Sequence, residues 1–392
     1  MKKDSQKYLK KYVKHFEDIT LPFFEKYMIS KESIIYNCVD DKGRVIANDR
    51  FSWSMGRALY SVSYFAKLYN LDKNYDKLIK KNLNFCIRKF CKNLDKIPYS
   101  LDKKGKVLDS TNSNFSLYFL SLAFIKIYQN NHSKQFLKRE FIDIILRKNL
   151  FVFLNKKKFN HYPLKLSNNS NSLSKKMCLI NFLWEIHSIS SYENNKFIAK
   201  KMARKLLRSF SKYGYLTEDG LNKKENLICP GHIVEAIWFS LEVLLDNKEF
   251  IDISDKDQKL IYQVYLNIDK LFNYGWDKKY GGLFHNLLIQ KNHKFKIVND
   301  SKTWWSAAEL FLCLSFFERI NYNFTKKNKE YLAITYKYIE KNFFSKKNND
   351  WKQKLNRDHS REIKNIGLPV RDFFHYPRSV FKIKEILIKS KN

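Results

Sequence analysis

Polar residues recur at one position of a repeating unit in this chain. They stand early in the helix expected after each of six short hairpins, or just before it in the last unit: Arg57, Asn114, Asn181, His232, Glu309 and His375. Histidine is suited to general acid–base catalysis near neutral pH, and arginine can stabilise an oxyanion as it develops. The pattern therefore predicts one pocket, surrounded by a ring of helices, in which His232 and His375 face each other.

The repeating unit consists of a short aromatic strand, a turn rich in Asp, Asn, Lys or Gly, a second short strand and an amphipathic helix. Its copies are spaced by roughly sixty residues, a period typical of repeat architectures in which neighbouring units bury one another's apolar faces. They begin near Ile35, Tyr99, His161, Tyr215, Leu283 and Trp351. Turn residues support the hairpins at Asp40–Gly43, Asp102–Gly105 and Thr217–Gly220.

Two sets of helices are predicted from apolar residues at i, i+3, i+4 and i+7. The first set is aromatic and follows the hairpins: Phe51–Tyr69, Phe115–Tyr128, Lys175–Ser188, His232–Leu245, Trp304–Glu318 and Pro377–Lys389. The second set has a Lys-rich face: Asp76–Cys91, Lys138–Leu154, Asn194–Tyr213, Asp257–Phe272, Lys329–Phe343 and, at the N-terminus, Tyr8–Met28. We expect an inner and an outer ring of six helices each. No Pro/Gly-rich linker divides the chain, so residues 1–392 are predicted to form a single domain.

Composition agrees with a large cytoplasmic protein. Hydrophobic residues make up 44% of the 392 residues and aromatic residues 16%, enough for a large core. The N-terminus resembles no signal peptide, and no apolar run reaches the roughly 20 residues that span a bilayer, so no membrane partner is expected. The six cysteines show no metal-ligand spacing and are expected to be buried thiols in a reducing cytoplasm, with no metal bound.

The net charge of +35 comes from 74 Lys and Arg against 39 Asp and Glu. The excess is mostly lysine spread along the chain together with abundant Asn, Ile, Phe and Tyr, residues that share A/T-rich codons. Codon bias is therefore a sufficient explanation. Because the sequence has no compact arginine cluster or recognition motif, we expect a solvated basic surface and no nucleic-acid partner. Homodimer formation is left open.

Four segments, in order along the chain, carry a resemblance to a known family. They are Tyr36–Arg57, Gly231–Phe239, Gly275–Glu309 and Phe374–Arg378, and they contain six of the ten glycines. Together they resemble the N-acylglucosamine 2-epimerase superfamily, which includes cellobiose 2-epimerases and aldose–ketose isomerases. The resemblance implies an all-α (α/α)6 barrel with short β-hairpins on one rim, and a sugar 2-epimerase or isomerase that needs no cofactor.

The resemblance also has departures, which leave the substrate sugar open. Ser30–Ile35 stands where the family usually has a Gly-Gly pair, Met55 replaces its usual Gln, and Ser306–Ala308 replaces a stretch with Pro and a polar residue. The Gly-Trp-Asp motif at Gly275 and the His-x-Pro-Arg motif at His375 are similar to the N-acylhexosamine branch.

A 2-epimerase removes the proton at C2 of the opened sugar and returns a proton on the opposite face, through an enediolate. The resemblance implies that His232 and His375 transfer the proton and that Arg57 is the essential arginine. Arg57 would stabilise the enediolate or O1; its structural alternative is a buried salt bridge to Glu309 or Asp49. Further substrate-binding candidates are Glu235, Glu309, Trp304, Trp305, Arg378, Asn181 and Trp53.

Two other functions remain open at this point. An inverting glycoside hydrolase on the same barrel would use two carboxylates roughly 6.5–9.5 Å apart, for which Glu235 and Glu309 are candidates. The facing histidines would then be unexplained. The second open function is that of a non-catalytic basic binding protein with a degenerate pocket. The expected ligand is a small-molecule sugar.

Overall fold

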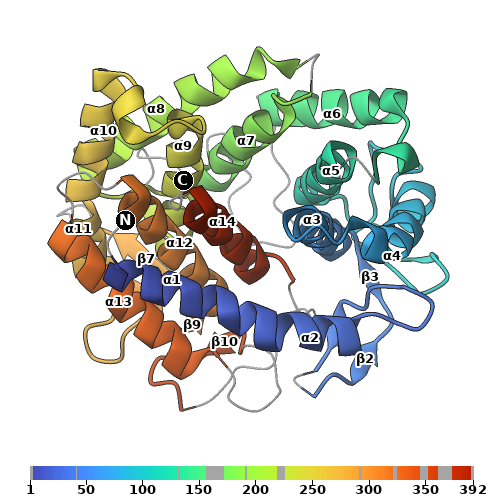
Figure 1. Cartoon of the computed structure of the whole chain (residues 1–392), viewed down its shortest axis with the longest axis horizontal. Helices are drawn as coiled ribbons and strands as arrows, with labels where there is room; N and C mark the ends of the chain where they lie inside the picture. Colours follow the sequence, from blue (N-terminus) through green and yellow to red (C-terminus); the bar gives the residue numbers. More distant parts are fainter. Residues whose placement is uncertain are drawn as a thin grey trace.

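The protein forms a double ring of helices, shown in Figure 1. The computed structural model describes residues 3–40, 42–130, 133–155, 172–189, 192–218, 226–290, 294–320, 325–344, 352–360 and 373–389. Within these ranges, helices account for the rings, and strands occur as short antiparallel pieces. None of the helices in these ranges is long and apolar enough to span a bilayer.

Six of the described helices form the inner ring. They are α3 (Ser52–Leu68), α5 (Asn114–Gln129), α7 (Leu173–Ile186), α9 (Pro230–Leu245), α12 (Trp304–Ile320) and α14 (His375–Lys389). Each packs against the next in chain order, and α14 returns to pack against α3, so the ring is closed. Because these helices have neighbours on nearly every side, they are apolar around most of their circumference, as their aromatic sequences predict.

The outer ring surrounds the inner one. It consists of α1 (Lys3–His15) with its continuation through α2 (Leu21–Phe23), α4 (Asp72–Phe85), α6 (Arg139–Leu154), α8 (Asn195–Tyr213), α10 (Asp255–Leu266) with α11 (Ile268–Gly275), and α13 (Thr325–Asn342). These helices bury one face and expose their lysines on the other. The two predicted rings are therefore confirmed in the described parts of the chain, and the predicted Asp257–Phe272 helix is divided at Asn267.

The strands form hairpins on the rim where the inner helices begin. They are β1 (Cys38–Val39) with β2 (Val45–Ala47), β4 (Ser100–Leu101) with β5 (Val107–Asp109), and β7 (Asn286–Ile289) with β8 (Phe295–Asn299). A strand from the preceding unit extends the last two: β3 (Arg50–Phe51) pairs with β4, and β6 (Asn226–Ile228) pairs with β7. Since β3 leads directly into α3, this pairing ties the start of one inner helix to the next hairpin.

The predicted hairpins near Ile35, Tyr99 and Leu283 are confirmed. The one predicted at His161 lies outside the described residues, as does the tip of the one that begins near Tyr215. In the sixth unit Trp351 lies outside them too, and the described strand β10 (Lys354–Leu355) pairs with β9 (Lys302–Thr303) of the fifth unit. The second hairpin is described along its whole length, so it shows which residues close the turn.

In that turn, the Asp102 carboxylate accepts the backbone N–H groups of Lys104 and Lys106 at 2.8 and 2.9 Å. Gly105 has φ +89, a conformation that favours glycine. The Asp40 carboxylate closes the first hairpin in the same way.

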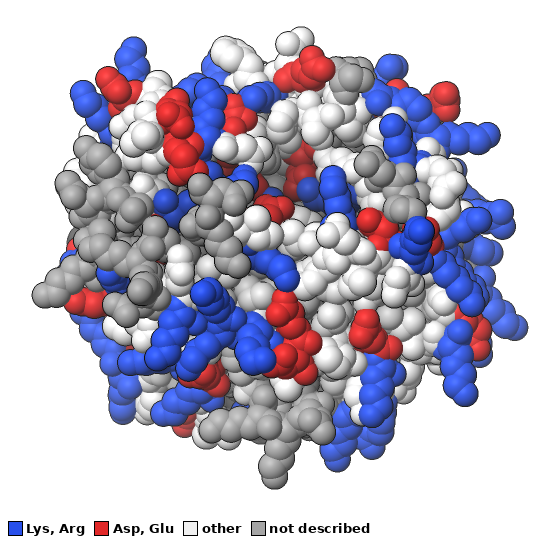
Figure 2. All heavy atoms as spheres, viewed as in Figure 1, with Lys and Arg blue, Asp and Glu red and all other residues white. Residues whose placement is uncertain are grey.

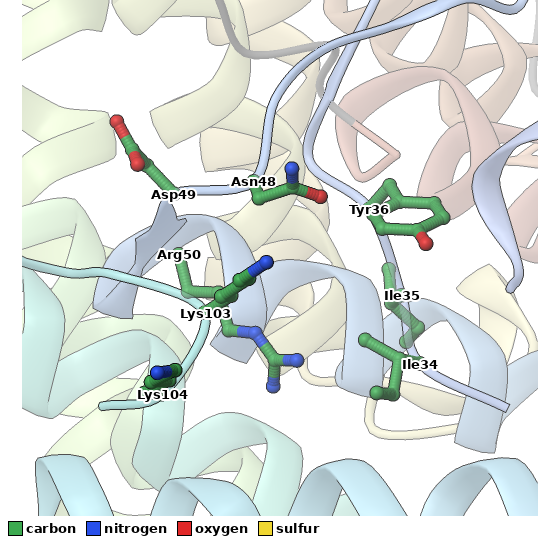
Figure 3. A pocket seen from close by; sticks show the side chains of 8 residues that line it. All are labelled: Ile34, Ile35, Tyr36, Asn48, Asp49, Arg50, Lys103 and Lys104. Atoms are coloured by element: carbon green, nitrogen blue, oxygen red, sulfur yellow. The ribbon is translucent and has the colours of Figure 1, made fainter. Parts of the chain in front are cut away.

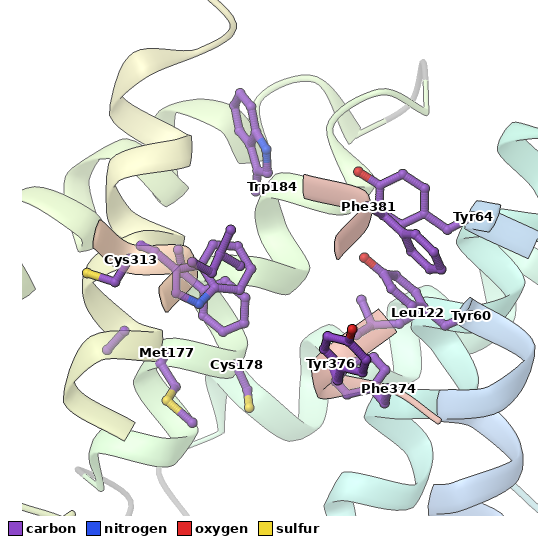
Figure 4. Packing of buried hydrophobic residues seen from close by; sticks show 14 of the residues in the cluster. Tyr60, Tyr64, Leu122, Met177, Cys178, Trp184, Cys313, Phe374, Tyr376 and Phe381 are labelled. Carbon is purple, nitrogen blue, oxygen red and sulfur yellow. The ribbon is translucent and has the colours of Figure 1, made fainter. Parts of the chain in front are cut away.

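The core lies between and within the rings. Figure 4 shows buried side chains from several inner helices meeting in it, among them Tyr60, Cys178, Cys313 and Phe381. All six cysteines are buried and unpaired thiols, as expected. Gly56 allows α3 and α5 to pack closely, because a Cβ atom there would lie 2.6 Å from the backbone of Phe119 on α5. This contact fixes the spacing of α3 and α5 below the first two hairpins.

Candidate active site

Glu309 on α12 is the centre of a buried polar cluster. Its side chain is inaccessible to solvent. Its Oε1 atom lies 2.7 Å from Nδ1 of His375 and 2.7 Å from Nη2 of Arg378, and its Oε2 atom accepts the indole N–H of Trp238 at 2.6 Å. A buried carboxylate is stable only when its oxygen atoms are hydrogen-bonded, and here both of them are.

Arg378 joins two carboxylates. Its Nη2 atom also donates to Oε1 of Glu235 at 2.5 Å, so one cation bridges Glu235 and Glu309. Burial opposes its charge, but the two carboxylates outweigh burial and raise the pKa of Arg378 above its ordinary value. The bridge connects α9, α12 and α14 at the ends where those helices begin.

The Glu309 carboxylate orients His375. A carboxylate only accepts hydrogen bonds, so the proton of the neutral imidazole lies on Nδ1 and Nε2 is left with its lone pair. Arg378 helps to hold the acceptor in place, because its Nη2 atom donates to the same Oε1 of Glu309 at 2.7 Å. His375 is therefore prepared to accept a proton at Nε2.

His232 is held by a second buried carboxylate. Its Nδ1 atom lies 2.7 Å from Oε1 of Glu218, whose side chain is 1% exposed. Burial lowers the pKa of His232, but neighbouring Cys229 and the Glu218 carboxylate outweigh it and raise the pKa well above its ordinary value. The two histidines thus sit in different environments, one beside a thiol and a carboxylate, the other beside a carboxylate and a guanidinium.

Trp305 connects the two histidines. Its ring centroid lies 5.2 Å from that of His232 and 5.6 Å from that of His375. Gly231 makes room for the indole, because a Cβ atom at that position would lie 2.6 Å from two of its ring carbons. His232 and His375 therefore share one aromatic neighbour, as expected if both serve one pocket.

The start of α12, and with it Trp305, is anchored by a buried ion pair. The Asp277 carboxylate accepts from Nζ of Lys302 at 3.1 Å and from Nε of Arg357 at 2.8 Å. Burial opposes the Asp277 charge, but Arg357 and Lys302 lower its pKa to about 2, and burial lowers the pKa of Lys302 to about 8. Asp277 of the Gly-Trp-Asp motif thus has a structural role, because it holds Lys302, the residue two positions before Trp304.

Arg57 lies among aromatic rings on α3. Its guanidinium carbon is 4.3 Å from the ring centroid of Trp53, 4.1 Å from that of Phe119 and 5.0 Å from that of Phe374. Phe374 in turn packs edge-on against His375, with centroids 5.2 Å apart. Glu309 pairs with His375 and Arg378 rather than with Arg57, so the salt bridge considered as the structural alternative for Arg57 is not formed with this carboxylate.

Two predicted residues lie farther from this cluster. Asn181 on α7 accepts the hydroxyl of Tyr118 at 2.8 Å, and Tyr118 packs on Phe119, the ring beneath Arg57. Trp304 is half-buried at the start of α12 beside Trp305. The structure thus brings together His375, Glu309, Glu235, Arg378, Trp305 and His232. Phe374 lies between His375 and Arg57, and Arg57 in turn packs on Trp53.

Sequence reasoning missed several members of the site. Trp238 follows Glu235 by one helical turn, so its spacing was a usable signal. Glu218 belongs to the hairpin before α9, and nothing in the local pattern connects it to His232. His285 is not among the predicted site residues, but its ring packs edge-on against Trp305 with the ring centroids 6.1 Å apart, and burial lowers its pKa to about 4.

Two described groups have the side chains and spacing that could hold a metal ion. They are Glu218, Cys229 and His232, and Glu235, Glu309 and His375, with the ligand atoms in each group within 4.8 Å of one another. In the second group Arg378 already supplies the positive charge between the carboxylates. The first group offers sulfur, nitrogen and oxygen, a set that Zn²⁺ accepts.

A closed double ring of helices, with short hairpins on the rim where the inner helices begin, defines an (α/α)6 barrel. The family model for N-acylglucosamine 2-epimerase (GlcNAc 2-epimerase) matches residues 35–378, and the chain belongs to this family.

Individual proteins either match less than half of this chain or share few identical residues with it. The N-acylglucosamine 2-epimerase of Rattus norvegicus is 26% identical over 178 residues, 44% of this chain and 40% of that protein. The protein of the same name from Bos taurus is 28% identical over 185 residues, 44% of this chain and 39% of that protein, so the match spans less than half of either relative. A D-mannose isomerase structure has a TM-score of 0.75 at 16% identity, covering 99% of both chains, and confirms the fold.

Proposed function

We propose that this chain is a sugar 2-epimerase or aldose–ketose isomerase that exchanges the C2 proton of an open-chain sugar. The observation that carries the proposal is the pair of histidines, each bound through Nδ1 to a buried carboxylate and each in contact with Trp305. Membership of the N-acylglucosamine 2-epimerase family supports it.

In the proposed reaction His375, neutral and with a lone pair on Nε2, accepts the proton from C2. The electrons of the broken C2–H bond form the C1=C2 double bond, and negative charge develops on O1. The Arg57 guanidinium stabilises that charge. His232, whose pKa is raised, returns a proton to the other face of C2. In the reverse direction the two histidines exchange roles. Delivery of the proton to C1 instead, with the O2 proton passing to O1 as the C2=O bond forms, gives isomerisation.

The proposed substrate class is an N-acylated hexosamine or its parent hexose. The names of the curated relatives and the Gly-Trp-Asp and His-x-Pro-Arg motifs support the acylated sugar. Trp305 supplies a flat apolar face of the kind that packs against a sugar ring. Glu235 and Arg378 would then face the sugar hydroxyl groups from α9 and α14.

The geometry disfavours an inverting glycoside hydrolase. Carboxylate oxygen atoms of Glu235 and Glu309 lie within 4.8 Å of each other and share one Arg378 nitrogen. An inverting mechanism needs roughly 6.5–9.5 Å between the carboxyl groups to admit a water molecule. Both carboxylates are also occupied by the guanidinium, which leaves neither available as a general acid.

The test is proton exchange in D2O. The protein is incubated with N-acetylmannosamine, N-acetylglucosamine, mannose and glucose, and deuterium at C2 is measured by NMR. We expect exchange with at least one of these sugars, and its loss in His232→Asn and in His375→Asn. His187→Asn, at the end of α7, is the matched control and should exchange normally. No exchange with any of the four sugars, or near-normal exchange in either site variant, would contradict the proposal.

A further inference from the structure

A cavity of about 280 Å³ opens on the hairpin rim, and it shares no lining residue with the candidate active site. Figure 3 shows Arg50, Lys103 and Lys104 on one side of this cavity and Ile34, Ile35 and Tyr36 on the other. It lies between the segment before the first hairpin, strand β3 and the turn of the second hairpin. Its volume is close to the lower limit of small-ligand sites, about 300 Å³.

Arg50 is the unusual member of this lining. The residue is 7% exposed, and its guanidinium carbon lies 3.9 Å from the ring centroid of Phe85. Arginine is rarely buried without an acidic partner. Within the described ranges, however, no carboxylate lies within ion-pair distance of this guanidinium. Burial accordingly lowers the pKa of Arg50.

The backbone holds this cation in place. Arg50 pairs with Leu101 in the β3–β4 ladder, and the Asp102 carboxylate fixes the turn that carries Lys103 and Lys104. The cations therefore come from ordered backbone rather than from free chain ends. Little rearrangement would be needed to bring them to one ligand.

The charges around the cavity favour an anion. Arg50, Lys103 and Lys104 are opposed by a single carboxylate, that of Asp49. Asn48 adds an amide group and Tyr36 a phenolic hydroxyl. A planar guanidinium fork with ammonium groups beside it is the donor set that recognises phosphate oxygen atoms.

We infer that this cavity binds a phosphate group, either as free phosphate or carried by a small sugar. The bound anion would replace the acidic partner that Arg50 lacks and would connect β3 with the second hairpin. Since β3 leads into α3, the ligand would also stabilise the start of the helix that carries Trp53 and Arg57. The inference does not depend on the proposed epimerase activity.

Calorimetric titration of the full-length protein at low salt tests the inference, with inorganic phosphate and glucose 6-phosphate as probes. Both should bind the wild type, and Arg50→Met should bind at least about tenfold more weakly, because it loses the charge-assisted hydrogen bonds. Lys104→Gln should weaken binding less. Lys42→Gln is the matched control, since Lys42 has the same turn position in the first hairpin but does not line the cavity; its affinity should be unchanged.

The two probes also separate the two sources of phosphate. Equal affinities assign the cavity to free phosphate, and tighter binding of glucose 6-phosphate assigns it to a sugar phosphate. The inference is overturned if neither probe binds at millimolar concentration. It is also overturned if Arg50→Met and Lys104→Gln both bind with wild-type affinity. If Arg50→Met does not fold, Lys104→Gln decides alone, because its side chain is exposed on a turn.

Discussion

Oε1 of Glu218 lies 2.7 Å from Nδ1 of His232, across the rim where α9 begins. Replacing this carboxylate by an amide, Glu218→Gln, keeps the shape and removes the charge. The pKa of His232, which Cys229 and Glu218 raise against the effect of burial, should fall, so the protonated form of this proposed proton donor should be lost at a lower pH. We expect kcat to fall at least about tenfold, with a shifted pH profile of kcat/KM. An unchanged profile would mean that Glu218 does not act through His232.

The same contact should affect stability in a pH-dependent way. The pKa of His232 is raised in the folded protein, so its pairing stabilises the fold fully below the unfolded value of about 6.5. That contribution is lost as the pH rises through the raised folded pKa. Urea unfolding of wild type and Glu218→Gln should therefore differ most in mildly acidic buffer and least in alkaline buffer. A difference independent of pH would contradict this assignment.

Arg57→Lys separates a catalytic role of Arg57 from a structural one. Lysine keeps the charge but cannot stack flat between Trp53 and Phe119 or offer a planar fork of donors. If Arg57 stabilises the enediolate, kcat should fall about a hundredfold or more, with a smaller effect on substrate affinity. A lower melting temperature with normal turnover per folded molecule would instead assign Arg57 to packing.

Arg378→Met tests the bridge between Glu235 and Glu309. The substitution leaves two buried carboxylates without their cation, so the free energy of unfolding should fall by about 3–5 kcal/mol. Arg44→Met is the control: Arg44 pairs with Asp40 at 2.7 Å, but its side chain is 73% exposed. Loss of that surface pair should cost at most about 1 kcal/mol. Equal losses in the two variants would show that the buried bridge contributes no more than a surface pair.

Gly231→Ala tests whether Trp305 must lie close to α9. The added Cβ would come within 2.6 Å of the indole, so Trp305 must move away from both histidines. We expect a large loss of kcat in a protein that still folds. Gly275→Ala is the matched control, because its Cβ would meet its neighbours only at 3.5 Å. It should retain activity, and a normal Gly231→Ala enzyme would show that the position of Trp305 is unimportant.

The helical rings and the rim hairpins were predictable, because they follow from periodicity and turn chemistry that act over short distances. Asp102 and Gly105 close their turn through contacts within five residues of chain, and the apolar helices follow at the expected positions. His232, His375 and Arg57 were predicted as site residues in the same way, as polar residues at repeated positions of the unit, and their catalytic roles stay a prediction.

The pairing within the site was not predictable, since it depends on side chains from different units. Glu309 was expected to contact substrate or Arg57, but it binds His375 and Arg378 from α14 and Trp238 from α9. Helical periodicity tells which face of a helix is buried, but not which neighbour's side chain reaches it. Glu218 and His285 were missed for the same reason.

The lysine-rich charge is also visible as expected, with Lys and Arg spread around the face in Figure 2 and Asp and Glu between them.

The closure of the inner ring has a consequence for folding kinetics. Helix α14 packs against α3 and α1, and the hydroxyl groups of Tyr12 and Ser379, 367 positions apart in the chain, lie 2.8 Å from each other. Contacts over such separations form slowly, because the intervening chain must first be ordered. His375 and Arg378 both belong to α14, so an intermediate with an open ring contains only one of the two histidines that we propose transfer the proton. Recovery of activity during refolding should therefore coincide with docking of α14, with no active intermediate before it.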